Sequence, residues 1–170
     1  MTNDFWIKHK VEQVNCLIPR EDSNPEYEGF MLNAMIGEAV IGSGDQSIST
    51  GKCSLLWLSR SLIRLCTFPV LYASEAYESV METSTALRSR FQDGTLAISV
   101  QESRKQVLTF QVPLVTAIQT VGAFHNDLLL TLFQSCPVLR DYGTLLVRIP
   151  DAFAIEQMLR SQERAASGNV

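Results

Sequence analysis

Pro113–Gln134 reads PLVTAIQTVGAFHNDLLLTLFQ and predicts a long amphipathic helix against which the rest of the chain packs. At 3.6 residues per turn, its apolar side chains gather on one broad face and its polar side chains fall mostly on the other. Pro113 suits the first helical turn, because the N–H that proline lacks has no partner there. His125 also points into the apolar face and is the first candidate for a functional group. The apolar face comprises Ala117, Ile118, Val121, Phe124, Leu128, Leu129 and Leu132.

The composition is that of a globular chain. Its 170 residues are 46% hydrophobic and 19% charged, which suits one domain and argues against a disordered or fibrous class. The net charge of −4 gives little support to nucleic-acid binding, which needs clustered Lys and Arg. The most apolar runs are shorter than the roughly 20 residues of a membrane span. We therefore expect one domain over residues 1–165, with a frayed tail over 166–170, that binds neither nucleic acid nor membrane.

The cysteines give no sign of a metal site. Cys16, Cys53, Cys66 and Cys136 lie far apart in the sequence, form no CxxC pair, and are accompanied by only two histidines. The N-terminal residues MTNDFWIKHK lack the apolar core of a secretion signal. We expect reduced thiols in a cytoplasmic protein that holds no metal and no cofactor.

The first half of the chain predicts strands followed by helices. Phe5–Val14 alternates with period two, which places Trp6 on its polar face and His9 on its apolar face. Polar and turn-forming residues follow. The further expected elements are strands over Phe30–Ile36 and Ala39–Ile41, joined by a tight turn at Gly37-Glu38, a helix over Leu55–Leu65 that Pro69 stops, and a helix over Glu75–Phe91 that Asp93-Gly94 terminates.

The second half predicts a hairpin and two more helices. Thr95–Gln101 and Val107–Val112 alternate and read as a β-hairpin that leads into the long helix. Cys136-Pro137 breaks that helix, Leu145–Ile149 reads as a last strand, and Asp151 caps a final helix that extends to about Ala165. The expected order is βββ-αα-ββ-α-β-α. This is an α+β fold in which an antiparallel sheet of hairpins and a meander packs with about four helices.

Candidate catalytic features are weak. Residues 42–53, GSGDQSISTGKC, depart from a phosphate-binding loop, since Gln46 and Cys53 stand where that motif needs a glycine and a hydroxyl. We expect a plain loop there. His125 could act as a general base, but Asp127 cannot orient it, because two residues along a helix turn a side chain by about 200°. We expect His125 to be a neutral core histidine bonded to a carbonyl or hydroxyl group, and His9 to be similar. No catalytic residue is assigned.

Partner-binding candidates are acidic or aromatic. Acidic residues gather in the loop after the first strand and again on one face of the predicted Glu75–Phe91 helix. The simpler interpretation of both clusters is a solvated surface, and the sharper one is docking to a basic partner. Trp6, with Lys8 and Lys10 on the polar face of its strand, is a candidate anchor. The acidic candidates are Glu21, Asp22, Glu26 and Glu28 in the loop and Glu75, Glu78 and Glu82 on the helix.

The sequence Asp4-Phe5-Trp6-Ile7, then Tyr27-Glu28-Gly29-Phe30, then Ile36-Gly37-Glu38 and Ile41-Gly42 follows a pattern of small and apolar positions. Over residues 4–65 this pattern resembles immunity proteins of bacterial polymorphic toxin systems, in particular those paired with contact-dependent growth inhibition toxins. The resemblance implies a cytoplasmic protein that is not an enzyme. Such a protein binds a cognate toxin C-terminal domain, often a nuclease, and occludes its active site or substrate groove. The resemblance carries over no functional residue, because such families vary their toxin-binding surfaces.

Two other classes stay open. A small acidic secretion chaperone would bind one effector and would usually be a dimer with an exposed apolar groove. An enzyme of unrecognised type would need His125, or a cysteine, to line an open pocket. For the immunity protein we expect a monomer or a weak dimer.

Overall fold

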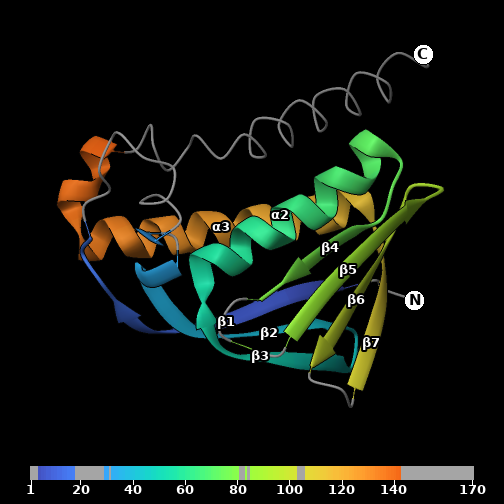
Figure 1. The fold of residues 1–170 in the computed structure, drawn as a ribbon, viewed down its shortest axis with the longest axis horizontal. Coiled ribbons are helices and arrows are strands. Elements are labelled where there is room, and N and C mark those ends of the chain that lie inside the picture. The colour runs from blue at the N-terminus through green and yellow to red at the C-terminus, as the bar shows by residue number, and fades with distance from the viewer. Residues whose placement is uncertain are drawn as a thin grey trace.

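The computed structural model describes residues 4–17, 29–30, 32–80, 83, 85–102 and 106–142, and at 102, 106, 141 and 142 it describes the backbone alone. Within these ranges the chain forms two antiparallel sheets and two long helices (Figure 1). The predicted α+β class is confirmed. The expected strand over Leu145–Ile149, the final helix from Asp151 and the tail over 166–170 lie outside the described residues, as does most of the acidic loop.

The elements form two meanders separated by a helix. The first three strands pair as a three-stranded sheet, and the next four strands pair as a four-stranded sheet, each in sequence order. The expected order of elements, with about four helices, is therefore not matched. The elements are β1 (Phe5–Val14), β2 (Met35–Ser43), β3 (Gln46–Ser54), α2 (Leu55–Tyr72), β4 (Ala76–Ser79), β5 (Thr85–Gln92), β6 (Thr95–Glu102), β7 (Gln106–Pro113), α3 (Leu114–Ser135) and the 3-10 helix η1 (Pro137–Tyr142).

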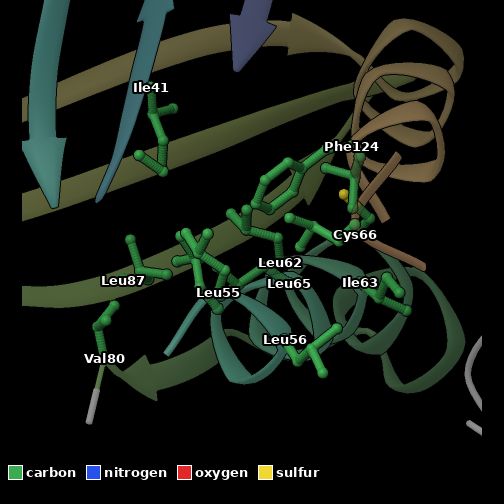
Figure 2. Packing of buried hydrophobic residues seen from close by; sticks show 14 of the residues in the cluster. Ile41, Leu55, Leu56, Leu62, Ile63, Leu65, Cys66, Val80, Leu87 and Phe124 are labelled. Atoms are coloured by element: carbon green, nitrogen blue, oxygen red, sulfur yellow. The ribbon is translucent and has the colours of Figure 1, made fainter. Parts of the chain in front are cut away.

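Both helices lie on the same side of the sheets (Figure 1). They pack against each other and against the inner sheet faces, and side chains from α2, α3 and both sheets form one apolar cluster (Figure 2). Leu62 of α2, Phe124 of α3, Ile41 of β2 and Leu87 of β5 meet in this cluster. By length and composition α2 could cross a membrane, but 61% of it is buried inside the fold, as in the core helix of a globular domain.

Three predicted elements are confirmed: strand β1, the β6–β7 hairpin and helix α3. The long helix begins at Leu114, so Pro113 immediately precedes its first turn. Residues expected on its apolar face, including Val121, Phe124 and Leu128, are buried. Thr120 on the same helix donates a hydrogen bond to the carbonyl of Phe5, which fixes α3 beside β1. The segments with the most regular apolar periodicity thus form the elements predicted for them.

The predicted turn at Gly37-Glu38 is wrong, and so is the predicted loop after it. Met35–Ser43 is one continuous strand, and β3 occupies most of the stretch expected to be a loop. Gly37 lies inside β2, where close packing leaves no room for a side chain. A Cβ there would collide with the carbonyl oxygen of Lys10 and lie 2.8 Å from Cδ1 of Leu55. The sequence does not predict β3 as a strand because most of its side chains are Ser, Thr, Gln or Lys. The expected strand from Phe30 also begins later, since Phe30 has helical backbone.

Pro69 does not stop α2, which continues to Tyr72. A proline inside a helix cannot donate to the carbonyl four residues before it, here that of Leu65. The buried hydroxyl of Ser89 on β5 donates to that carbonyl at 2.6 Å instead. The four-stranded sheet therefore supplies the hydrogen bond that Pro69 cannot make, and it fastens β5 to α2.

The predicted helix over Glu75–Phe91 is wrong, because β4 and β5 occupy this region. Thr85, Leu87 and Ser89 alternate inward with period two, and this alternation prevails over the helical spacing seen in the sequence. Asp93 and Gly94 both adopt positive φ, 51° and 79°, and make the two-residue turn between β5 and β6. The Asp-Gly pair is a hairpin signal here, not a helix end.

The expectation of four reduced thiols is wrong for one pair. Cys16, just after β1, and Cys136, just after α3, form a disulfide across a sequence separation of 120 positions. Cys53 and Cys66 lie buried in the core, outside the disulfide. Burial raises the pKa of the Cys66 thiol to about 12, which keeps that side chain protonated. The disulfide ties the first strand to the end of the long helix.

Replacing Ser89 with Ala should lower the free energy of unfolding by about 1–3 kcal/mol, because it leaves the buried Leu65 carbonyl without a donor. In a Pro69→Ala background residue 69 regains an N–H for that carbonyl, so the same Ser89→Ala change should cost less than half as much. Urea unfolding of the four chains of this double-mutant cycle measures both costs. An equal cost in both backgrounds would show that the Ser89 hydroxyl does not replace the missing N–H.

Reducing the disulfide should lower the free energy of unfolding by about 2–5 kcal/mol, because the open chain gains conformational freedom when unfolded. Urea unfolding with and without dithiothreitol gives this difference. The Cys16→Ser/Cys136→Ser double variant is the control, and its unfolding midpoint should not respond to the reductant. An unchanged midpoint for the native chain would mean that the disulfide contributes nothing to stability.

Candidate functional site

The outer face of the three-stranded sheet carries the most exposed aromatic and charged arrangement predicted from the sequence. Strand alternation directs Trp6, Lys8 and Lys10 of β1 away from the core, and the helices cover the opposite face (Figure 1). On β2 the outward positions opposite Trp6 and Lys8 are Gly42 and Val40. Trp6 and Val40 are half-buried, and Lys8 and Lys10 are exposed. The structure therefore places the predicted anchor Trp6 on an open sheet face.

Trp6 lies flat on this face. A Cβ added at Gly42 would collide with the indole ring, so the ring rests directly on the backbone of β2. Lys8 Nζ lies 4.8 Å from the ring centroid, within the range of a cation–π interaction. Contacts with the Gly42 backbone and with the Lys8 ammonium over the ring leave it little rotamer freedom. Trp6 is thus a pre-organised aromatic surface.

The charges farther along the same sheet face are partly balanced. Lys52 Nζ lies 2.9 Å from Glu12 Oε2, and this contact holds the pKa of the Glu12 carboxyl below its usual value. The Ser49 hydroxyl donates to Glu38 Oε1 at 2.6 Å. Beside these pairs lies a shallow hollow of about 230 Å³, lined by Lys8, His9, Lys10, Glu38 and Val40. A partner would therefore meet an aromatic ring next to a hollow with charges of both signs.

His125 lies in the core, as predicted. Its side chain is 7% exposed, and its Nδ1 lies 2.7 Å from the buried Ser59 hydroxyl on α2. Burial lowers the pKa of His125, because desolvation disfavours the charged imidazolium. The pair supplies a polar contact between the two helices, and this contact satisfies both groups inside an apolar core. The expected hydrogen bond to a carbonyl or hydroxyl group is confirmed.

His9 is half-buried and pairs with Asp127, the acid that cannot orient His125. His9 Nε2 lies 3.2 Å from Asp127 Oδ2, and the His9 ring packs edge-on against Phe124 with centroids 5.2 Å apart. Asp127 therefore orients His9 toward α3. The two histidines have different partners. The partner of His125 is Ser59, which was not predicted from the sequence.

The acidic candidates do not form the predicted helical face. Glu75 is exposed in the connection before β4, whereas Glu78 is half-buried and its Oε1 lies 3.2 Å from Arg64 Nε on α2. The two carboxylates do not share one surface, because the segment that holds Glu78 is a strand. The remaining acidic candidates, Glu21, Asp22, Glu26, Glu28 and Glu82, lie outside the described residues.

The P-loop interpretation rejected at the sequence level has no counterpart in β3. Gly51 and Lys52 lie in this strand, and Lys52 is engaged with Glu12. Within the described part of the chain, no three His, Cys, Asp or Glu side chains are arranged to hold a metal ion. Comparison of the chain with protein-family models, with curated proteins and with solved structures finds no match.

The stability of the domain should fall as the pH drops below about 6.5. The pKa of His125 is lowered from its ordinary value of 6.5, so the unfolded chain takes up this proton first and acid favours unfolding. The loss should continue until the pH passes the lowered pKa of the folded state. Urea unfolding between pH 7 and pH 4 should show this component in the native chain and in His9→Gln, but not in His125→Gln. Parallel pH profiles for the native chain and His125→Gln would contradict the assignment.

Proposed function

We propose that this chain is an immunity protein that binds the C-terminal toxin domain of a bacterial polymorphic toxin and blocks it without catalysis. The observation that carries the proposal is the fixed position of Trp6 on the open face of the three-stranded sheet. Tryptophan is enriched among the residues that dominate protein–protein binding energy. A ring already held by Gly42 and Lys8 loses little side-chain entropy when a partner covers it.

The same region carries the resemblance to immunity proteins. Gly37 and Gly42 belong to the sequence pattern that resembles that group, and Trp6 stands at the unspecified middle position of its Phe-x-Ile strand start. In the fold Gly37 makes room for Leu55 in the core, and Gly42 makes room for Trp6 on the surface. The small positions of the pattern therefore support both the packing of the sheet and the presentation of its aromatic residue.

Charge enters the proposal as a separate contribution. The acidic loop residues Glu21, Asp22, Glu26 and Glu28 would attract a basic toxin cleft over a distance and raise the association rate. Trp6 would act after contact and slow dissociation, because its burial is lost when the complex separates. The two contributions can be separated by kinetics.

The compartment stays a prediction. An immunity protein must meet its toxin where the toxin acts, and the resemblance places this meeting in the cytoplasm. A disulfide such as Cys16–Cys136 persists more readily in an oxidising compartment. We propose a cytoplasmic protein that keeps the Cys16–Cys136 disulfide there. Trapping free thiols in intact cells determines the state of the pair.

Substituting Trp6 with Ala should weaken binding to the proposed toxin domain by about 30-fold or more, since a hot-spot tryptophan contributes about 2 kcal/mol or more. Surface plasmon resonance should show that most of the loss is faster dissociation. Cells that co-express the toxin should lose protection to a matching degree.

Leu130→Ala, which truncates a side chain that is 59% exposed on α3, is the matched control and should bind normally. Reversing the four loop acids should mainly slow association. Thermal unfolding of each variant verifies that the fold is intact. Full affinity and full protection by a folded Trp6→Ala protein would contradict the role of this face.

A further inference from the structure

The outer face of the four-stranded sheet is a cationic surface on an acidic protein. Every second residue of β4 to β7 points away from the core, and the registers align these residues in rows across the sheet. The outward positions carry Arg88 and Arg90 but no Asp or Glu, although the chain as a whole has a net charge of −4. Their other side chains are small, hydroxyl-bearing, amide-bearing or apolar. Among the outward positions of the described strands, the charged side chains are therefore all cationic.

Arg88 is held in place with its hydrogen-bonding edge free. Its guanidinium lies 5.3 Å from the ring centroid of Tyr77, its cross-strand neighbour on β4. Among the described residues Arg88 makes no ion pair, and the side chain is exposed. The contact with Tyr77 restricts the guanidinium, whose N–H donors lie in the plane of the group. Within the described part of the chain, Arg88 is thus a cation without an anionic partner.

A small hollow adjoins this guanidinium. It has a volume of about 160 Å³ and is lined by Ala86, Arg88, Ser99, Gln101 and Val107. The short side chains of Ala86 and Ser99 leave room, while Arg88 and Gln101 supply donors and Val107 supplies an apolar wall. The Ser99 hydroxyl is already bonded to Thr109 Oγ1 at 2.9 Å, which fixes this part of the lining. The hollow has the size and the donors for a single carboxylate side chain.

Arg90 differs from Arg88 in its surroundings. It shares a larger hollow of about 530 Å³ with the exposed Glu75, so an acid of this chain already lies near its charge. Arg88 has no such neighbour lining its hollow. The unbalanced charge of the face is therefore centred on Arg88.

We propose that this face binds an acidic polypeptide segment, and that one of its carboxylates enters the hollow and is bound by the Arg88 guanidinium. Arginine and a carboxylate match as a planar, doubly hydrogen-bonded pair. Nucleic acid fits the face less well, because two arginines neutralise few phosphates and the Tyr77 ring is already stacked on Arg88. This inference uses the four-stranded sheet alone and does not depend on the toxin proposal.

The test titrates the full, isotope-labelled chain with a deca-glutamate peptide in about 150 mM salt and follows backbone amide signals by NMR. The expected result is a set of shifts centred on Arg88, Ser99 and Gln101. Arg88→Gln should weaken binding about tenfold, which corresponds to the loss of one charge-assisted hydrogen-bonded pair. Arg60→Gln removes the same charge from α2 and should leave the affinity unchanged.

Three outcomes would overturn the proposal. The first is an absence of shifts on β5 and β6 with deca-glutamate. The second is equal weakening by Arg88→Gln and Arg60→Gln, which would show attraction to overall charge alone. The third is tighter binding of a ten-nucleotide oligo-dT on the same face, which would make it a nucleic-acid surface. Loss or retention of toxin binding bears on none of these outcomes.

Discussion

The hydrogen bond from the Ser89 hydroxyl to the Leu65 carbonyl is the constraint on which the arrangement of helices and sheets depends. Without it, Pro69 would leave a buried acceptor empty in the middle of α2. With it, α2 continues for another turn and joins the four-stranded sheet at β5. The helix can then bury a broad arc of leucines, including Leu55 and Leu62, between the two sheets (Figure 2). The hydrogen bond from Ser89 thus allows α2 to pack in a single apolar core shared by both sheets.

Because both helices cover the inner sheet faces, the outer faces of both sheets are left open in the described part of the chain. On each outer face a cation lies over an aromatic ring. On the three-stranded sheet Lys8 lies over the half-buried Trp6 ring, and the ring is held against the backbone of β2. On the four-stranded sheet Tyr77 supports Arg88, and the guanidinium edge is the exposed group. A rigid aromatic surface suits an apolar contact, whereas a fixed guanidinium suits an acid, so we assign the two faces different partners.

The sequence predicted elements wherever one local pattern dominated. The ten alternating residues of β1 and the long apolar stripe of α3 needed no tertiary information. The continuation of α2 past Pro69 could not be predicted, because the compensating donor is 24 positions away on another element. In the segment of β4 and β5, helical and strand periodicities competed, and only packing against α2 decides between them.

The site was predictable to a similar extent. Trp6 was found from the polar face of its strand, but the role of Gly42 beneath its ring required the strand register. The burial of His125 followed from the apolar stripe. Its partner could have been sought among lone polar residues on other apolar helix faces, and Ser59 is one of these. The Cys16–Cys136 pair left no local signal, because only the complete fold brings the two residues together.

The central claim is that an outer sheet face, not the helical layer, binds the toxin. Hydrogen–deuterium exchange of the chain alone and in complex with the proposed partner, a C-terminal toxin domain, tests this claim most directly. The account predicts slower exchange in β1 and β2 around Trp6 and Val40, with the amides of α3 around Leu130 unchanged. Slower exchange confined to α3, with β1 and β2 unaffected, would contradict it.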